Sequence, residues 1–374
     1  MAVRALARVN LAAIERNCAR LRRELSGGAA LCAVVKADGY GHGAAPSARA
    51  ALAGGATWLA VATAEEAARL RAEGVDARLL VMGALSAEEL PVALAADADL
   101  VAWHESFVAQ LAAAGRPARL HVKLDTGMGR LGTRDPEQAL RVADAVAGAP
   151  GLELAGAMTH FATADERGRD DDFFDTQLER FETFAERLRK SHPGLVVHAA
   201  NSAGTLRAAA AHFDLVRCGI AIYGLDPFQE DAAARDLEPA LELCSYVGEL
   251  KTCAPGESAG YGRRFVAEHD TTLAVLPIGY GDGVRRALTN NADVLIGGVR
   301  RALRGAVSMD NLTVDVGDAA GVRLGDPATL IGADGGERIA AEELARRLET
   351  INYEITTAIT ARVPRDYHRD GKPV

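Results

Sequence analysis

Residues 31–35 have the sequence Leu-Cys-Ala-Val-Val and are followed directly by Lys36. A short, continuous apolar run rich in β-branched residues is typical of a strand that is buried on both faces of a sheet. Runs of the same kind recur along the first 230 residues, at 57–62, 78–82, 98–102, 118–124, 152–159, 195–199 and 214–217.

The segments between these runs are rich in Ala, Leu, Glu and Arg and have helical periodicity, for example at 64–72, 136–147 and 173–190. Strands without polar alternation are expected where helices cover both faces of a parallel sheet. Eight strands that alternate with helices over this length predict a (β/α)8 barrel, an α/β fold, with a doubly wound parallel sheet as the alternative.

The pattern changes near Asp236. The later apolar segments, at 241–250, 271–278, 293–296, 311–316 and 328–331, are short and separated by Gly, Pro, Asp and Asn. This spacing predicts a mainly antiparallel β domain, interrupted by a helix over 340–348 and completed by a last strand near 353–363. We therefore expect a barrel over residues 1–235 and a β domain over 236–374, joined by the polar stretch 226–238.

Composition narrows the class of protein. Of the 374 residues, 49% are hydrophobic and 25% charged, and the formal charge of −9 argues against nucleic acid as a partner because no basic excess exists. There is no apolar run of about 18 residues and no signal peptide, so we expect no membrane span. The five cysteines are widely spaced without a C-x-x-C pair, which indicates neither disulfides nor a metal site. We expect a cytoplasmic protein.

Lysine is scarce. The chain has Lys36, Lys123, Lys190, Lys251 and Lys372, against 37 arginines. Lys36 follows a buried strand, where the ordinary explanation is an amine that reaches solvent or forms an ion pair. The functional explanation is a lysine that forms a Schiff base, whose amine becomes less basic when a pocket desolvates it.

Further polar residues follow or end the predicted barrel strands: Lys123 and Arg130 at the fifth, His160 at the sixth, His198 with Asn201 and Ser202 at the seventh, and Arg217 at the eighth. Barrel enzymes place their catalytic groups at these strand ends, so the residues should converge on one mouth. Ser202 and Gly219 lie where barrels often bind phosphate, although Ser202 could simply cap a helix. A reactive lysine together with a phosphate site indicates pyridoxal 5′-phosphate (PLP).

The stretch AVVKADGYGHGA at 33–44 resembles the PLP-lysine motif of bacterial alanine racemases. The resemblance continues along the chain in VKLDTGMGRLG (122–132), HFATAD (160–165), AANSAG (199–204), VRCGIAIYG (216–224), SAGYGRRF (258–265), PIGYGDG (277–283), VSMDNLTVDV (307–316) and INYEI (351–355). One departure is Cys218, where many members of the family have Pro.

The resemblance implies an isomerase that interconverts L- and D-alanine through an imine of the amino acid with PLP, supplying D-alanine for peptidoglycan. It implies Lys36 and Tyr261 as two opposed bases, with Tyr261 supplied by the other subunit of a homodimer. The implied cofactor-binding residues are Lys36, Tyr40, His160, Asn201, Ser202, Arg217, Gly219, Ile220 and Tyr353. Arg130, Met309 and Asp310 are implied to face the substrate, and Lys123 to be carbamylated.

Three alternatives remain beside this interpretation. Residues 127–132 fit the G-x-G-x-x-G pattern of NAD(P)-dependent oxidoreductases, although Asp125 and Thr126 separate the glycines from the strand. A non-catalytic PLP-binding protein would share the barrel but would need neither a second base nor the β domain. A racemase of serine or of a larger amino acid could use the same scaffold.

Overall fold

The computed structural model describes residues 3–166, 173–318 and 321–374, and its contacts divide the chain into two compact units. The first, called the barrel unit below, comprises Ile14–Gly39 and Ala44–Ile222. The second, the β unit, comprises Met1–Ala13, Tyr40–Gly43 and Tyr223–Val374.

In the part of the chain that the structure describes, the barrel unit contains eight parallel strands in the order β8-β7-β6-β5-β4-β3-β2-β9. The strands are β2 (Ala30–Val34), β3 (Trp58–Val61), β4 (Arg78–Val81), β5 (Asp99–Ala102), β6 (Ala118–Lys123), β7 (Leu152–Met158), β8 (Val196–His198) and β9 (Leu215–Cys218). Backbone hydrogen bonds from Asp214 to Val197 (3.0 Å) and from Arg217 to Ala200 (2.9 Å) connect the two ends of the sheet. The predicted barrel is confirmed.

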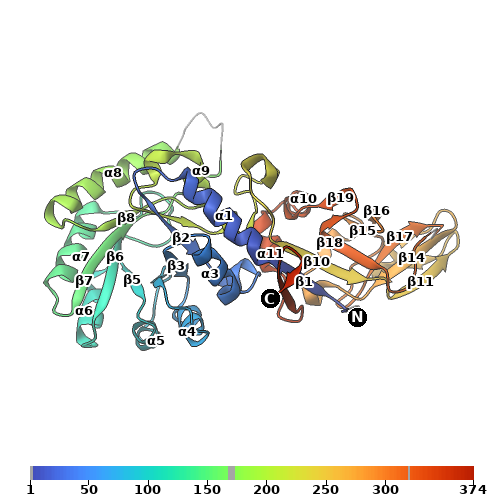
Figure 1. Ribbon diagram of the computed structural model, residues 1–374, viewed down its shortest axis with the longest axis horizontal. Helices are drawn as coiled ribbons and strands as arrows, with labels where there is room; N and C mark the ends of the chain where they lie inside the picture. Colours follow the sequence, from blue (N-terminus) through green and yellow to red (C-terminus); the bar gives the residue numbers. More distant parts are fainter. Residues whose placement is uncertain (1–2, 167–172, 319–320) are drawn as a thin grey trace. The chain divides into compact units, whose positions relative to one another are not determined.

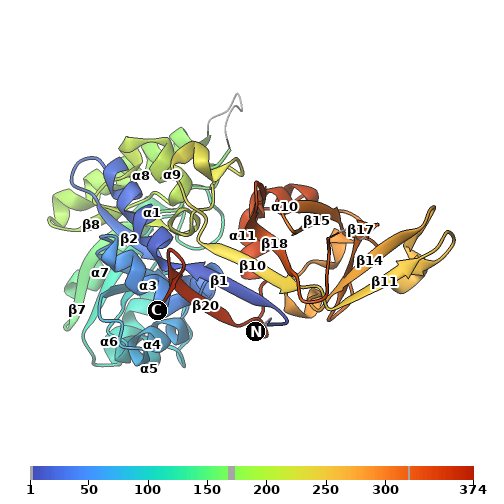
Figure 2. The same cartoon turned by 45° about the vertical axis from the view of Figure 1, so that its right-hand side comes forward.

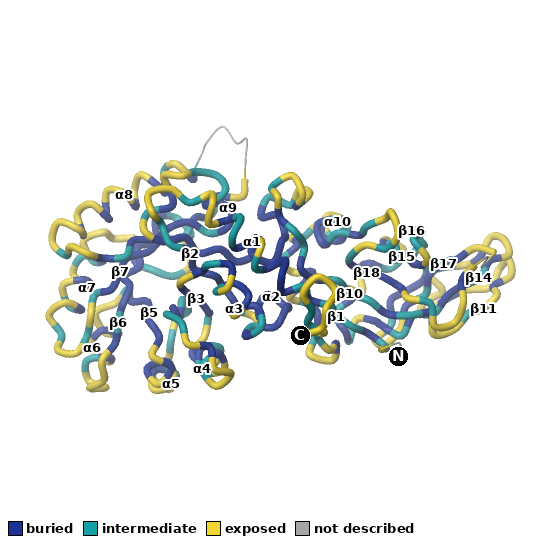
Figure 3. The backbone as a smooth tube through the Cα atoms, in the orientation of Figure 1, coloured by how far each residue is buried: buried dark blue, intermediate teal, exposed yellow. Residues whose placement is uncertain are grey.

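Helices surround these strands (Figure 1). They are α1 (Leu11–Glu24), α3 (Ala44–Ala53), α4 (Ala64–Ala72), α5 (Leu90–Ala95), α6 (Glu105–Ala113), α7 (Pro136–Gly148), α8 (Phe173–Ser191) and α9 (Ser202–Arg207). Figure 3 shows β6 as mostly buried and β7 as buried in its second half, whereas the helices beside them carry exposed residues. The longest helix, α8, buries Phe174, Phe181 and Phe184 along one face, as its 3.6-residue periodicity predicts.

The β unit contains a large mixed sheet in the order β16-β15-β18-β10-β1-β20-β21, with β19 paired to β18. Its strands are β1 (Leu6–Asn10), β10 (Leu241–Tyr246), β15 (Asp293–Ile296), β16 (Val299–Ala302), β18 (Pro327–Asp334), β19 (Glu337–Ile339), β20 (Arg365–Arg369) and β21 (Lys372–Pro373). A second sheet comprises β11 (Glu249–Cys253), β14 (Thr271–Leu276) and β17 (Leu312–Gly317), and a hairpin comprises β12 (Ser258–Ala259) and β13 (Phe265–Val266). The mainly antiparallel character of this domain was predicted correctly.

The N-terminal segment belongs to the β unit, whereas the sequence analysis assigns residues 1–235 to the barrel. Strand β1 pairs antiparallel with β10, Leu6 opposite Cys244, and parallel with β20, Ala7 opposite Arg365 (Figure 2). Alternate residues of β1 are buried, as expected of a strand with one face on a core. The boundary at residue 235 stays a prediction, and it does not account for this strand.

The prediction of a last strand near 353–363 is wrong. Residues Asn352–Thr357 form the helix α11, which follows α10 (Ala341–Arg347), and the last long strand, β20, begins only at Arg365. Ile355 and Ile359 are four residues apart and both buried, which is the spacing of one helix face rather than of a strand. The apolar content of this segment therefore indicated burial but not the type of element.

Candidate active site

The residues predicted at the mouth of the barrel all lie at or just beyond the carboxyl ends of its strands. Lys36 follows β2, Lys123 ends β6, His160 follows β7, His198 ends β8 and Arg217 lies in β9. Lys123, His198 and Arg217 are buried, and Lys36 and His160 are half-buried. Since parallel strands of a barrel end at the same face, one mouth contains all five side chains.

The turn after Lys36 has an unusual backbone. Ala37, Asp38, Gly39 and Tyr40 have φ angles of 50°, 51°, 62° and 53°, so four consecutive residues are left-handed and only one of them is glycine. This conformation costs about 1–2 kcal/mol for each residue with a Cβ. Two carboxylates hold the turn: Glu66 accepts from the N–H of Ala37 (2.6 Å), and Asp38 accepts from the N–H of Ala44 (2.9 Å).

The guanidinium of Arg217 is fixed by acceptors from two neighbouring strands. Its Nη1 donates to Nδ1 of His198 (2.7 Å), and its Nη2 donates to the carbonyls of Thr159 (2.8 Å) and Ala199 (3.0 Å). Nη2 also lies 3.3 Å from Nδ1 of His160. Both histidines must be neutral at the nitrogen that accepts from Arg217. Burial and the charge of Arg217 hold the pKa of each imidazole well below its ordinary value. Both imidazoles are therefore neutral at pH 7.

Two residues behind Arg217 were missed by the sequence analysis. His198 contacts His121 (Nε2 to Nδ1, 2.8 Å), and Nε2 of His121 lies 3.1 Å from Oδ2 of Asp99, which ends this series of contacts. One signal was present in the sequence, because His121 lies two positions before Lys123 and alternate residues of a strand share a face. Asp99 also left a signal, as a carboxylate inside the apolar run at 98–102, but its partners come from other strands and could not be named from the sequence.

The mouth of the barrel is strongly cationic. Burial, reinforced by the charges of Arg217 and Arg130, lowers the pKa of Lys123 to about 8. The pKa of Lys36 is also lowered, first by burial and then by Arg130 and Arg217. Burial lowers the pKa of Arg217 to about 10, which leaves it charged at pH 7. Such a site favours the binding of anions such as phosphate and carboxylate.

Ser202 and Gly219 lie together, as the phosphate prediction requires. The buried hydroxyl of Ser202 accepts from the N–H groups of Gly219 (3.0 Å) and Ala221 (3.4 Å). Asn201, not Ser202, caps helix α9, by accepting from the N–H of Gly204 (2.9 Å). The capping role that could have explained Ser202 therefore belongs to its neighbour.

In the glycine-rich loop at 127–132, the N–H groups of Gly127 and Gly129 face a carboxylate of the same chain. The carboxylate of Asp125 accepts from the N–H groups of Gly127 (3.1 Å) and Gly129 (3.0 Å), and Arg134 donates to the same carboxylate at 3.4 Å. In a dinucleotide site these glycine N–H groups would face a pyrophosphate. An internal anion already takes that place, so the oxidoreductase interpretation loses its main support.

Three of the implied site residues lie on exposed loops of the β unit. Tyr261 is 71% exposed and lies between β12 and β13, next to Gly260, and Met309 is 51% exposed. The carbonyl of Met309 accepts from the N–H of Gly281 (2.8 Å), and Asp310 accepts from Arg362 (2.7 Å).

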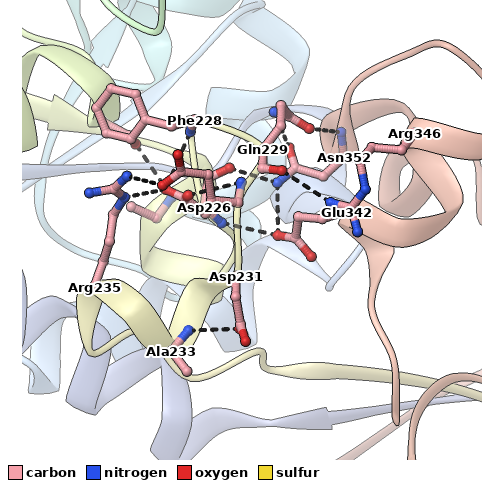
Figure 4. Close-up of polar contacts among 12 residues, drawn as sticks. Asp226, Phe228, Gln229, Asp231, Ala233, Arg235, Glu342, Arg346 and Asn352 are labelled. Carbon is pink, nitrogen blue, oxygen red and sulfur yellow. Dashed lines mark hydrogen bonds and ion pairs between the residues drawn. The ribbon is translucent and has the colours of Figure 1, made fainter. Parts of the chain in front are cut away.

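The β unit also contains Tyr40 and Tyr353, whose ring centroids lie 6.0 Å apart. The residue before Tyr353 is held by a buried polar cluster (Figure 4). The side chain of Asn352 donates to the carbonyl of Asp226 (2.8 Å) and to Oε1 of Glu342 (2.9 Å), and it accepts from Nε2 of Gln229 (3.0 Å). The start of helix α11, and with it the backbone of Tyr353, is fixed by these bonds.

Gln177 is a further residue that the sequence analysis missed. This fully buried side chain of helix α8 accepts from the N–H of Ala162 (2.7 Å) and donates to the carbonyl of His160 (3.2 Å) and to Thr126 (3.0 Å). It therefore holds the loop that carries His160.

Among the described residues, no helix is both long and apolar enough to cross a bilayer.

Comparisons with known proteins agree over most of the chain. Family models described as "Alanine racemase, N-terminal domain" and "Alanine racemase, C-terminal domain" match residues 9–227 and 240–367. An alanine racemase of Frankia casuarinae is 45% identical over 91% of this chain and 91% of its own length. Alanine racemase 1 of Bacillus subtilis is 39% identical over 98% of this chain and 93% of its own length.

Solved structures agree with the sequence comparisons. Alanine racemase from a D-cycloserine-producing Streptomyces lavendulae superimposes with a TM-score of 0.92 at 37% identity, covering 98% of both chains. The enzyme of Bacillus anthracis with bound L-Ala-P gives a TM-score of 0.91 at 37% identity, covering 99% of this chain and 96% of the other. The resemblance stated from the motifs is confirmed, and this chain belongs to the alanine racemase family.

Proposed function

We propose that this chain is a PLP-dependent racemase that interconverts L- and D-alanine, with each active site completed by a second copy of the chain. The observation that carries the proposal is the cationic mouth of the barrel, where Lys36, Lys123 and Arg217 are brought together. Family membership favours alanine over serine or a larger amino acid as the substrate. The D-alanine formed would supply peptidoglycan synthesis.

The residues at the mouth fit PLP, on which the alanine racemase family depends. The N–H on Nε of Arg217 has no partner among the described residues, so it is left to face a ring nitrogen. Lys36 would carry the cofactor on its Nζ, with His160 behind Arg217. Ser202, Gly219 and Ile220 would hold the phosphate, Asn201 would fix Ser202, and the resemblance adds Tyr40 and Tyr353. PLP supplies a ring that withdraws electrons from the Cα–H bond of a bound amino acid.

Racemisation requires a proton to leave one face of Cα and another to arrive at the opposite face, so two groups are needed. The lowered pKa of Lys36, caused first by burial, favours the neutral amine that accepts a proton on Nζ. The hydroxyl of Tyr261 would exchange the proton on the opposite face. Its 71% exposure supports a role at the site of a partner subunit, because a single chain leaves this ring in solvent.

The substrate carboxylate would be bound by Arg130 and by the backbone of Met309, with Asp310 beside them. Asp125 accepts from the backbone of the loop that carries Arg130, which fixes the backbone of that loop. Arg362 donates to the carboxylate of Asp310, which fixes that side chain. A carbamate on Lys123 would turn its repulsion of Arg130 into an ion pair. Tyr353 and Tyr261 would narrow the entrance and favour a methyl side chain.

Arg217 is proposed to suppress transamination. A guanidinium can only donate hydrogen bonds and keeps its charge, so it disfavours protonation of a ring nitrogen that it faces. Many PLP enzymes instead place a carboxylate there, which keeps the ring protonated and strongly electron-withdrawing. The neutral His160 and His198, which accept from Arg217, hold the guanidinium without taking its proton.

The test is the decay of the optical rotation of L-alanine, measured beside L-serine and L-lysine. We expect rapid decay with alanine only, no dependence on added NAD, and label at Lys36 after borohydride reduction of the loaded protein. Mixing inactive Lys36→Ala and Tyr261→Phe chains should restore about a quarter of the wild-type activity, because random pairing leaves one intact site in half of the dimers. Failure of the mixture to recover activity would refute the shared site, and preference for another amino acid would refute the substrate.

A further inference from the structure

A continuous series of buried polar groups runs through the interior of the barrel from Arg217 to Asp99. The contacts join Arg217 Nη1 to His198 Nδ1 (2.7 Å), His198 Nε2 to His121 Nδ1 (2.8 Å), and His121 Nε2 to Asp99 Oδ2 (3.1 Å). All four side chains are at most 3% exposed, and they come from β9, β8, β6 and β5 in turn. We call this series the Asp99–Arg217 relay.

The chemistry of its two ends fixes the position of every proton in the relay. Arg217 can only donate, so Nδ1 of His198 accepts and a neutral His198 carries its proton on Nε2. That proton is donated to Nδ1 of His121, and His121 in turn carries its own proton on Nε2, from which it donates to Asp99. The opposite order would place two N–H groups against each other at the contact with Arg217.

Asp99 is the anion at which the relay ends. Its other contacts come from Arg78 (2.9 Å) and Arg119 (2.6 Å), whose side chains are 37% and 29% exposed. Arg217 itself is surrounded by imidazoles and carbonyls. The two histidines therefore connect a buried cation to a carboxylate that lies three contacts away.

The neighbouring strand leaves room for this arrangement. Gly156 of β7 lies beside His121, and a Cβ at this position would come within 2.4 Å of Nδ1 of that ring. The same Cβ would also come within 2.4 Å of the backbone carbonyl of Val196, so both the ring and the neighbouring strand require glycine here. Gly156 thus leaves the space in which the His121 ring contacts both His198 and Asp99.

We propose that His121 and Asp99 are positioning residues of this enzyme, which hold His198 in the tautomer that accepts from Arg217 and so keep the guanidinium turned toward the cofactor. The tautomer assignment stands on the contacts alone. Its consequence for the reaction rests on the proposed function, in which Arg217 faces the ring nitrogen of PLP.

The direct test is ¹⁵N NMR of the full-length, PLP-loaded protein labelled at histidine, which reports whether each ring nitrogen carries a proton. We expect His121 and His198 to be protonated on Nε2 only, at every pH from 6 to 9. Protonation of His198 on Nδ1, or on both nitrogens, would overturn the proposal without any substitution. Arg119→Gln removes a partner of Asp99 outside the relay and should leave the protonation of His121 and of His198 unchanged.

A matched pair of variants tests the effect on Arg217. His121→Asn keeps an acceptor near the former Nδ1, whereas His121→Leu has nearly the same volume and no acceptor. We expect His198 to stay protonated on Nε2 only in the Asn variant, and to lose this single tautomer in the Leu variant. Pyridoxamine phosphate formed per turnover should rise several-fold in the Leu variant and stay near wild type in the Asn variant. Equal behaviour of the two variants would refute the relay.

The outcomes separate this inference from the proposed function. Borohydride labelling of Lys36 and racemisation by the wild-type protein depend on the proposed function and not on the tautomers. If both succeed while His198 carries its proton on Nδ1, the relay is wrong and the function stands. If the tautomers are as expected and Lys36 is not labelled, the relay stands as a structural feature and its link to the cofactor is lost.

Discussion

Lys123 is the residue whose surroundings predict a covalent modification. The side chain is 5% exposed, and burial together with Arg217 and Arg130 lowers its pKa to about 8, against about 10.4 for an ordinary lysine. At pH 7.5 about a quarter of the amine is then neutral, compared with about a thousandth for a solvated lysine. Only the neutral amine adds to CO2. We therefore expect Lys123 to form a carbamate, which replaces a cation with an anion among arginines.

The modification can be observed by ¹³C NMR of the protein in ¹³C-bicarbonate at pH 7.5, since acid destroys a carbamate before intact mass is measured. We expect one carbamate resonance in the wild type and none in Lys123→Met. A wild-type spectrum without the resonance would refute the reasoning. A resonance that survives in the variant would assign the carbamate to a different lysine.

The same shift of the pKa of Lys123 predicts how stability depends on pH in CO2-free buffer. The folded-state value of about 8 lies below the unfolded value of about 10.4, so between these pH values the unfolded chain binds more protons. The free energy of unfolding should therefore rise with pH across this window, by up to about 3 kcal/mol. Well below pH 8, Lys123 is protonated in both states and should add no pH dependence. Lys123→Met should lack the rise, and bicarbonate should flatten it. Urea denaturation at pH 8 and 10 measures the difference, and identical curves for wild type and variant would contradict it.

Three further predictions concern single side chains. Arg217→Glu should increase pyridoxamine phosphate formed per turnover, measured by chromatography of the released cofactor, and an unchanged yield would count against the role proposed for Arg217. Asn352→Leu should lower the free energy of unfolding by about 2 kcal/mol in urea, because the Glu342 carboxylate and the carbonyl of Asp226 each lose one of two donors; a loss below about 1 kcal/mol would mean that water replaces the amide. Asp125→Ala should release the glycine loop and raise KM for alanine more than it lowers kcat, since Arg130 loses its support; an unchanged KM would place Arg130 away from the substrate.

The barrel strands could be predicted closely because each is buried on both faces and its sequence is continuously apolar. The run at 78–82, for example, corresponds to β4 (Arg78–Val81). Strand β1 gave no such signal, because it lies in another sheet, where it pairs with β10 and β20. Pairing with residues more than 230 positions away leaves no trace in the local pattern. Asp99 lies inside the predicted apolar run at 98–102, so its burial could be expected, but the residues that pair with it lie on other strands and could not.

The glycine motif shows how one pattern serves two different structures. Glycines at 127, 129 and 132 have φ angles of 145°, 71° and 110°, so the backbone requires glycine at each position. In a dinucleotide fold the same spacing lets backbone N–H groups face a phosphate. Here the loop turns its N–H groups onto Asp125, a residue of its own chain. The spacing predicts a tight turn around an anion, and only the surrounding structure identifies that anion.

The cationic mouth of the barrel connects the fold to the proposed chemistry. Lys36, Lys123 and Arg217 are all placed where burial disfavours their charged forms, as their lowered pKa values show. A fold selected for stability alone would replace such groups by apolar residues. Their presence is reasonable only if anions accompany them, and the proposal provides three: the cofactor phosphate, the carbamate on Lys123 and the substrate carboxylate. Because each anion offsets part of the same electrostatic cost, binding of the cofactor and carbamylation of Lys123 should each strengthen the fold.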